Sequence, residues 1–175
     1  MLKRLARMWK ANDGAVAVEF AFLAPVMVLM FFGTVEITTA LDCKSRVNTV
    51  AATAADLVSQ ETSVSSTDMS NVFAALNTII YPYPTGAAQI VISSLNYSTS
   101  TTGTVAWSSA QNATARTAGS TVTVPAGVIA SGGSVILAEI TYAYSSPTTQ
   151  FLTGAVTMAN SFYARPRRSA SVTHT

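Results

Sequence analysis

A long apolar run near the N-terminus dominates the hydrophobic pattern of the chain. Residues 15–35 read AVAVEFAFLAPVMVLMFFGTV and contain one charged side chain, that of Glu19. At about 1.5 Å rise per residue, a helix of this length spans the roughly 30 Å hydrocarbon core of a bilayer. We therefore expect a single membrane-spanning helix here.

The helical pattern continues beyond this run. Apolar residues recur at helical spacing up to about residue 60, with polar and charged residues between them. We predict one helix over about 15–60, whose second half is an amphipathic stem for the rest of the chain to pack on. A Ser/Thr-rich turn and cap over 61–67 and apolar positions over 72–80 predict a second amphipathic helix.

Beyond Gly86 the pattern changes to short strand-like segments separated by Ser, Thr and Gly clusters. The predicted strands are 89–97, 104–110, 121–125, 134–145 and 157–165. The fold class we predict is α+β, with the helices on one face of a mainly antiparallel sheet of four or five strands. The organisation expected is a basic leader (1–14), a transmembrane helix and stem (15–62) and an outer α+β domain (63–175).

Charge is scarce, and most of the positive charge lies at the two ends of the chain. Charged residues make up 10% of it, against about 25% in soluble globular proteins. The basic leader places the N-terminus in the cytoplasm and the C-terminal domain on the outer side of the membrane. The nearly uncharged body argues against a nucleic-acid partner. We expect Arg165, Arg167 and Arg168 to form a solvated end, with contact to phospholipid headgroups or an acidic partner as the alternative.

Residue types for catalysis or metal binding are rare. Cys43 is the single cysteine and His174, the penultimate residue, the single histidine. One chain therefore cannot form a disulfide or a Cys/His metal site, and a histidine at a frayed terminus is a poor general base. Asp68 and Glu139 are isolated in sequence, so we expect neither enzymatic activity nor a cofactor. For Cys43 we expect a buried thiol, with an intersubunit disulfide as the alternative.

The start of the apolar run carries a family resemblance. Gly14 lies five positions before Glu19, behind a short basic leader. The stretch GAVAVEF followed by AFLAPVMVLMFFGTVE resembles the class 3 signal of type IV pilins, and more narrowly the TadE/TadG family of minor pseudopilins of the tight adherence (Flp) pilus. Residues 139–144 and 163–168 are also similar to TadE-like tails. The short chain places the resemblance nearer TadE than the larger TadG-like members.

The resemblance implies processing and assembly. A prepilin peptidase would cut between Gly14 and Ala15, which makes Glu19 the fifth residue of the mature chain. Its carboxylate would neutralise the new α-ammonium of Ala15 on a neighbouring subunit inside the bilayer. The implied partners are the peptidase, other pilin and pseudopilin subunits, the pilus assembly platform and the inner-membrane bilayer. Ala15 in place of Phe, and Phe20 in place of Tyr, both indicate a minor subunit, and the resemblance implies a role in the assembly of an adhesive pilus.

Three further residues of the membrane helix, Pro25, Gly33 and Glu36, carry expectations of their own. Pro25 is expected to kink it, and Gly33 belongs to the GTVE segment that adds to the resemblance. Glu36 lies at the outer end of the run, where we expect it to be solvated at the interface, with a pairing role between subunits as the alternative. Two rival interpretations are a secreted binding domain, released by a signal peptidase cutting before Leu41, and an unprocessed single-span accessory protein.

Overall fold

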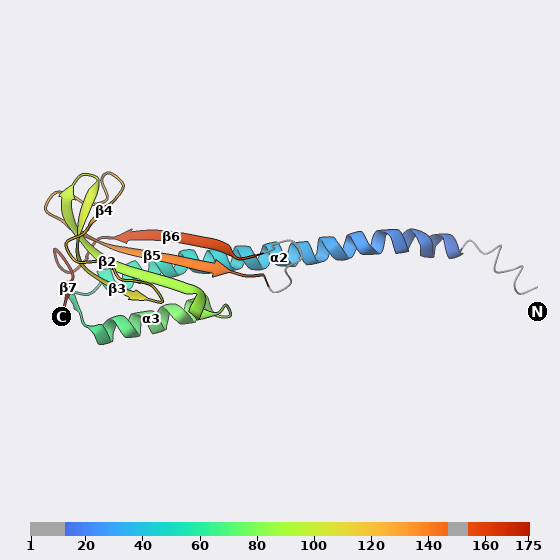
Figure 1. The fold of residues 1–175 in the computed structure, drawn as a ribbon, viewed down its shortest axis with the longest axis horizontal. Helices are drawn as coiled ribbons and strands as arrows, with labels where there is room; N and C mark the ends of the chain where they lie inside the picture. Colours follow the sequence, from blue (N-terminus) through green and yellow to red (C-terminus); the bar gives the residue numbers. More distant parts are fainter. Residues whose placement is uncertain (1–12, 147–153) are drawn as a thin grey trace, which may run out of the picture.

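One continuous helix organises the molecule. The computed structural model describes residues 13–146 and 154–175. Helix α2 (Asp13–Ser59) has 47 residues and so extends about 70 Å. It projects from the domain as a rod at its N-terminal end and passes along the domain at its C-terminal end (Figure 1). The predicted long helix with its stem is confirmed, and it includes Pro25 without ending there.

The second helix runs back along the first from a capped start. Helix α3 (Ser66–Ile80) follows the two-residue strand β1 (Ser63–Val64). The side chain of Ser65 accepts a hydrogen bond from the Asp68 backbone N–H at 3.2 Å, and the Asp68 carboxylate accepts from the Ser65 backbone N–H at 2.8 Å. This capping box satisfies two N–H groups that a helix start leaves without partners. The predicted cap and helix are thus both present.

A five-stranded sheet forms the rest of the domain. A short 3-10 turn, η1 (Thr85–Ala87), precedes β2, and the strands lie in the order β4-β3-β2-β5-β6 with every neighbouring pair antiparallel. Their bounds are β2 (Ala88–Thr99), β3 (Thr102–Gln111), β4 (Thr121–Thr123), β5 (Ser134–Tyr144) and β6 (Val156–Ala164). The α+β fold class is therefore confirmed, and the five predicted strands are all present.

The two faces of the sheet build two cores. On one face, Ile90 and Ile92 of β2 and Ile140 of β5 pack against α2 and α3. On the other, Leu95 and Leu137 belong to a smaller cluster that includes residues of β3 and of the connections around β4. Because side chains alternate along a strand, consecutive residues of β2 and β5 supply both cores. The domain is thus attached to the stem by its larger core.

The C-terminal residues return to the end of α2. Strand β7 (Thr173–His174) pairs in parallel with β1, and the Arg167 backbone N–H donates to the Ser59 carbonyl oxygen at 2.9 Å. The ring of His174 lies 5.5 Å from that of Trp107, whose indole N–H donates to the Val172 carbonyl at 2.7 Å. The expectation that His174 lies on a frayed terminus is wrong, because backbone pairing and a ring contact hold it in place.

Candidate functional site

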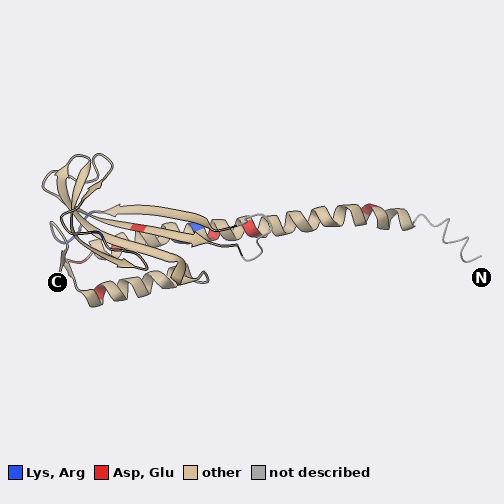
Figure 2. Cartoon of the chain, in the orientation of Figure 1, with Lys and Arg blue, Asp and Glu red and all other residues tan. Residues whose placement is uncertain are grey.

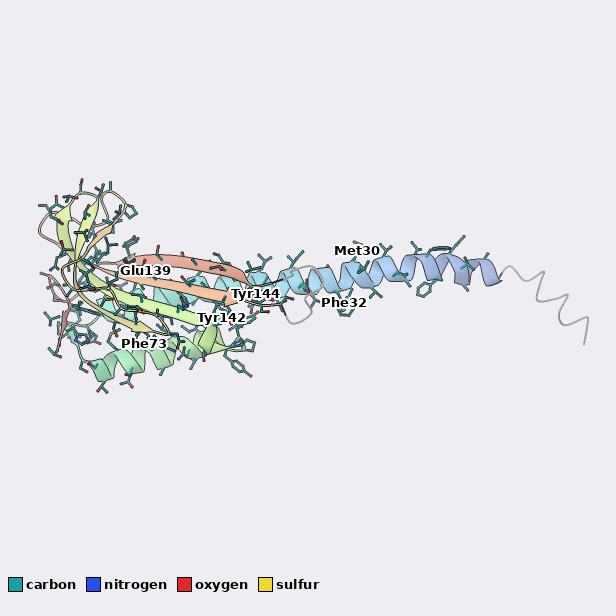
Figure 3. The ribbon with its side chains drawn as sticks, viewed as in Figure 1. Met30, Phe32, Phe73, Glu139, Tyr142 and Tyr144 are labelled. Carbon is teal, nitrogen blue, oxygen red and sulfur yellow. The ribbon has the colours of Figure 1, made fainter. Side chains whose placement is uncertain are left out.

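The N-terminal half of α2 is an apolar surface that the chain itself does not cover. Among the residues that the structure describes, one helix is long and apolar enough to cross a membrane, and no residue in its most apolar 18-residue window is buried. The side chains of Met30 and Phe32 project from this rod (Figure 3). The rod is also almost free of charge (Figure 2). It fits the anchor of a single-pass membrane protein.

Gly14 and Ala15 lie in the first turn of this helix, not ahead of it. Helix α2 begins at Asp13, and both residues are exposed. No other atom lies within 4 Å of the position that a Cβ would take at Gly14. The first backbone N–H groups of a helix have no partner within it. The peptide bond between the two residues is therefore accessible and belongs to the most easily unwound part of α2.

Glu19 and Phe20 share the exposed rod. Glu19 is exposed, and no hydrogen bond or ion pair joins its carboxylate to any residue within 13–146 or 154–175. The ring of Phe20 beside it is 63% exposed. Pro25 lies on the same rod, one to two turns further on. These positions are open to contact with lipid or with a neighbouring helix, and the role expected for Glu19 stays a prediction.

Gly33 and Glu36 lie on a different face of the helix. Both are buried, and the Glu36 side chain is only 1% exposed. The expectation that Glu36 is solvated is therefore wrong. Gly33 and Glu36 start a stripe with a spacing of three and four residues that continues through Cys43 and Val47 on the face toward the domain. Burial within its own chain also argues against a pairing role for Glu36 between subunits.

A polar contact fastens α2 to the end of α3. The Arg46 guanidinium donates to the Asp42 carboxylate at 2.8 Å and to the Ile79 and Tyr81 carbonyl oxygens at 3.1 and 2.6 Å. The Tyr83 hydroxyl donates to the Thr39 carbonyl at 2.8 Å and lies 2.9 Å from the Asp42 carboxylate. Arg46, and then Tyr83, hold the pKa of Asp42 below its usual range. The (i, i+4) spacing of Asp42 and Arg46 was a sequence signal for their pairing, but not for the contacts with α3.

The thiol of Cys43 is enclosed beside this contact. Its side chain is 1% exposed, and burial raises its pKa to about 11. A thiol in this position cannot reach a neighbouring chain while the domain stays packed on the stem. The expected buried thiol is confirmed.

The segment that follows β6 carries the C-terminal arginines and lies at the end of the molecule far from the N-terminus (Figure 1). Arg165 donates to the Gly127 carbonyl at 3.1 Å, and Arg167 pairs with Asp56 at 2.5 Å. Arg165, Arg167 and Arg168 are all exposed, as expected for a solvated end, and the first two also make these contacts with the domain and the stem. The C-terminal half of α2 separates them from the apolar rod, so they do not contact the headgroups of a membrane that the rod spans.

One ion pair on the sheet had no sequence signal. Arg116 binds Glu139 through both carboxylate oxygens, at distances of 2.8 to 3.0 Å. It holds the connection after β3 over the face of the sheet away from the helices. Within the described ranges, no group of three or more His, Cys, Asp and Glu side chains is placed to hold a metal ion.

Comparison with known proteins identifies the N-terminal segment. A model of the TadE family, described as TadE-like protein, matches residues 14–56. Comparisons with curated proteins and with solved structures each found no match. The matched segment starts at Gly14 and covers nearly all of α2, so the resemblance to this pilus-associated family is confirmed there. Over this helix, the chain is similar to the TadE/TadG-like family.

Proposed function

We propose that this chain is a minor pseudopilin-like subunit, nearer TadE than TadG, for the assembly of an adhesive tight adherence (Flp) pilus. It is a structural and non-enzymatic component, processed by a prepilin peptidase between Gly14 and Ala15. The observation that carries the proposal is that the TadE-like segment begins at Gly14 and includes the uncovered apolar half of α2. The mature protein spans the inner membrane once, with its outer domain (63–175) on the periplasmic or extracellular side.

The position of the proposed cut supports processing. The peptide bond lies in the first helical turn, where unwinding breaks few hydrogen bonds. Gly14 adds no side chain that would hinder a protease. Removal of residues 1–14 takes away the cationic leader and leaves an apolar helix with a free α-ammonium at Ala15.

The setting of Glu19 supports an assembly role. A carboxylate near the middle of a membrane helix costs roughly 2.5 to 3.5 kcal/mol, with less nearer the interface. Among the described residues of the same chain, no cationic group pairs with Glu19 to offset this cost. The α-ammonium of Ala15 on a neighbouring subunit provides one, and Phe20 is exposed for packing against the same neighbour. The pair thereby selects processed subunits for assembly.

The continuous helix supports a role as a rigid subunit. No linker interrupts α2 between the rod and the stem, and the stem is buried under β5, β6 and α3. The outer domain therefore keeps a fixed orientation relative to the anchor. A neighbour that binds the rod also positions the domain, which suits a subunit that initiates, caps or helps to assemble a fibre.

The first experiment is mass determination of the N-terminus in protein extracted from native membranes. Ala15 as the first residue is expected, and an intact Met1 with the peptidase present would refute processing. Leu41 would support the secreted binding domain, although that cut severs α2 beside Ala40, which packs against the core. Normal function in a Gly14 variant that resists cleavage would favour the unprocessed accessory protein.

The second experiment tests Glu19. Glu19→Ala is expected to leave membrane insertion intact and abolish pilus assembly, because the ammonium of the neighbour loses its partner. Glu61→Ala is the matched control, since Glu61 is an exposed acid beyond the far end of the same helix. Piliation and adhesion that stay unchanged in Glu19→Ala would remove the proposed pairing.

A further inference from the structure

The two edges of the five-stranded sheet differ in how they are covered. At the β3 edge, β4 pairs with the first residues, and the Val105 backbone exchanges two hydrogen bonds of 2.8 Å with Gly119 and Ser120. The C-terminal segment contacts Trp107 further along that strand. Strand β6 is the edge strand on the opposite side of the sheet, and no strand formed by the described residues pairs with its outer edge.

Hydrogen bonds show which backbone groups of β6 face outward. The Ser161 N–H donates to the Asn160 side-chain oxygen at 2.9 Å, and therefore not to β5. In an antiparallel pair the direction of the backbone groups alternates from residue to residue. Thr157, Ala159 and Tyr163 therefore also turn their backbone groups away from β5. Such a row of outward groups is a template for a strand of another chain.

Two side chains occupy the middle of this edge. The Lys44 ammonium of α2 donates to the Ala159 carbonyl at 3.2 Å, across 115 positions of sequence. The Asn160 amide oxygen accepts from the next outward group, the Ser161 N–H. An incoming strand would have to displace both contacts and place its backbone against an ammonium group. Soluble proteins commonly protect sheet edges with lysine in this way.

The anchor makes this protection useful. Strand β6 runs alongside α2 and in the same direction (Figure 1). Antiparallel pairing of two β6 strands would therefore point the two apolar rods in opposite directions. Two copies that span one membrane in the same direction cannot pair in this way. Antiparallel pairing of two β6 strands is therefore a misassembly.

We propose that Lys44, together with Asn160, blocks the β6 edge against strand addition by a second copy of this chain. This inference concerns the folded chain itself and does not depend on leader cleavage or on a pilus.

The test compares the self-association of full-length variants in detergent micelles by sedimentation velocity. Lys44→Met removes the ammonium and keeps an apolar stem, and Lys44→Arg keeps a cationic donor as the matched control. We expect Lys44→Met to associate at a roughly tenfold lower protein concentration than the parent, with Lys44→Arg close to the parent. Association of Lys44→Met that equals the parent over the whole concentration range would overturn the proposal.

A second substitution distinguishes edge pairing from loss of folding. Ser161→Pro removes an outward N–H that β5 does not use, and proline is tolerated at such edge positions. In the Lys44→Met background it should return association to the parent level, whereas aggregation of an unfolded chain would persist and contradict the proposal. Asn160→Ala leaves α2 unaltered and should shift the concentration of association in the same direction as Lys44→Met, by a smaller amount. If neither Asn160→Ala nor Lys44→Met shows a shift, the proposal is refuted.

Discussion

Two tyrosines of β5 differ in whether the hydroxyl group has a hydrogen-bond partner. The same substitution should therefore change the free energy of unfolding in opposite directions at the two positions. Tyr142 and Tyr144 are 2% and 1% exposed and lie on the face of the sheet toward the helices (Figure 3). The Tyr142 hydroxyl donates to the Pro84 carbonyl at 3.1 Å. The Tyr144 hydroxyl is buried and has no hydrogen-bond partner among the residues that the structure describes. Replacing each with phenylalanine removes only the hydroxyl group.

The expected free-energy changes follow from this difference. Burial of a hydroxyl without a partner costs about 1 to 3 kcal/mol, so Tyr144→Phe should raise the free energy of unfolding by about 1 kcal/mol after some loss of packing. Its ring contact with Tyr83, at 6.1 Å between centroids, does not need the hydroxyl. Tyr142→Phe loses a hydrogen bond worth about 0.5 to 1.5 kcal/mol. The two variants should therefore differ by about 2 kcal/mol.

The assay is thermal unfolding of the full chain in detergent, followed by circular dichroism. For a domain of this size, 1 kcal/mol shifts Tm by about 4 °C, so the two variants should differ by about 8 °C, on opposite sides of the parent. Tyr142→Phe is the matched control because it lies on the same strand and the same face. A Tm of Tyr144→Phe as low as that of Tyr142→Phe would show that the Tyr144 hydroxyl has a partner and refute the reasoning.

Three other predictions follow from the core. Cys43 should react with a maleimide only when the domain opens, so labelling of native chain should be slower by orders of magnitude than in denaturant, and rapid native labelling would contradict its burial. Burial raises the pKa of the Tyr142 hydroxyl from 10.0 to about 12. The stability that the neutral hydroxyl contributes is therefore complete below pH 10 and is lost as the pH rises to 12. Tyr142→Phe should lack this loss of stability when unfolding is measured between pH 10 and 12. Gly103→Ala should cost about 1 to 3 kcal/mol in denaturant unfolding, because its Cβ would lie 2.9 Å from Ile129 Cδ1 and 3.0 Å from Leu95 Cβ; wild-type stability would show that both side chains move aside freely.

The sequence determined the elements because each has a strong local cause. A 21-residue apolar run followed by apolar positions at helical spacing leaves little alternative to one long helix, and the Ser65–Asp68 box fixes the start of the next. Alternating segments between Ser, Thr and Gly clusters fixed the five strands to within a few residues. The Gly14 to Glu19 spacing likewise suggested the family from local sequence, as the TadE-like match over 14–56 confirms.

Tertiary structure decided which side of each element is covered and what its polar groups meet. The apolar run gives no sign that Gly33 and Glu36 face the domain whereas Glu19 and Phe20 do not, because that depends on where the sheet docks along α2. The contact of Lys44 with Ala159 joins residues 115 positions apart, and no local pattern encodes it. Local sequence sets backbone preference within a few residues, whereas burial and edge contacts depend on chain segments that meet only after folding.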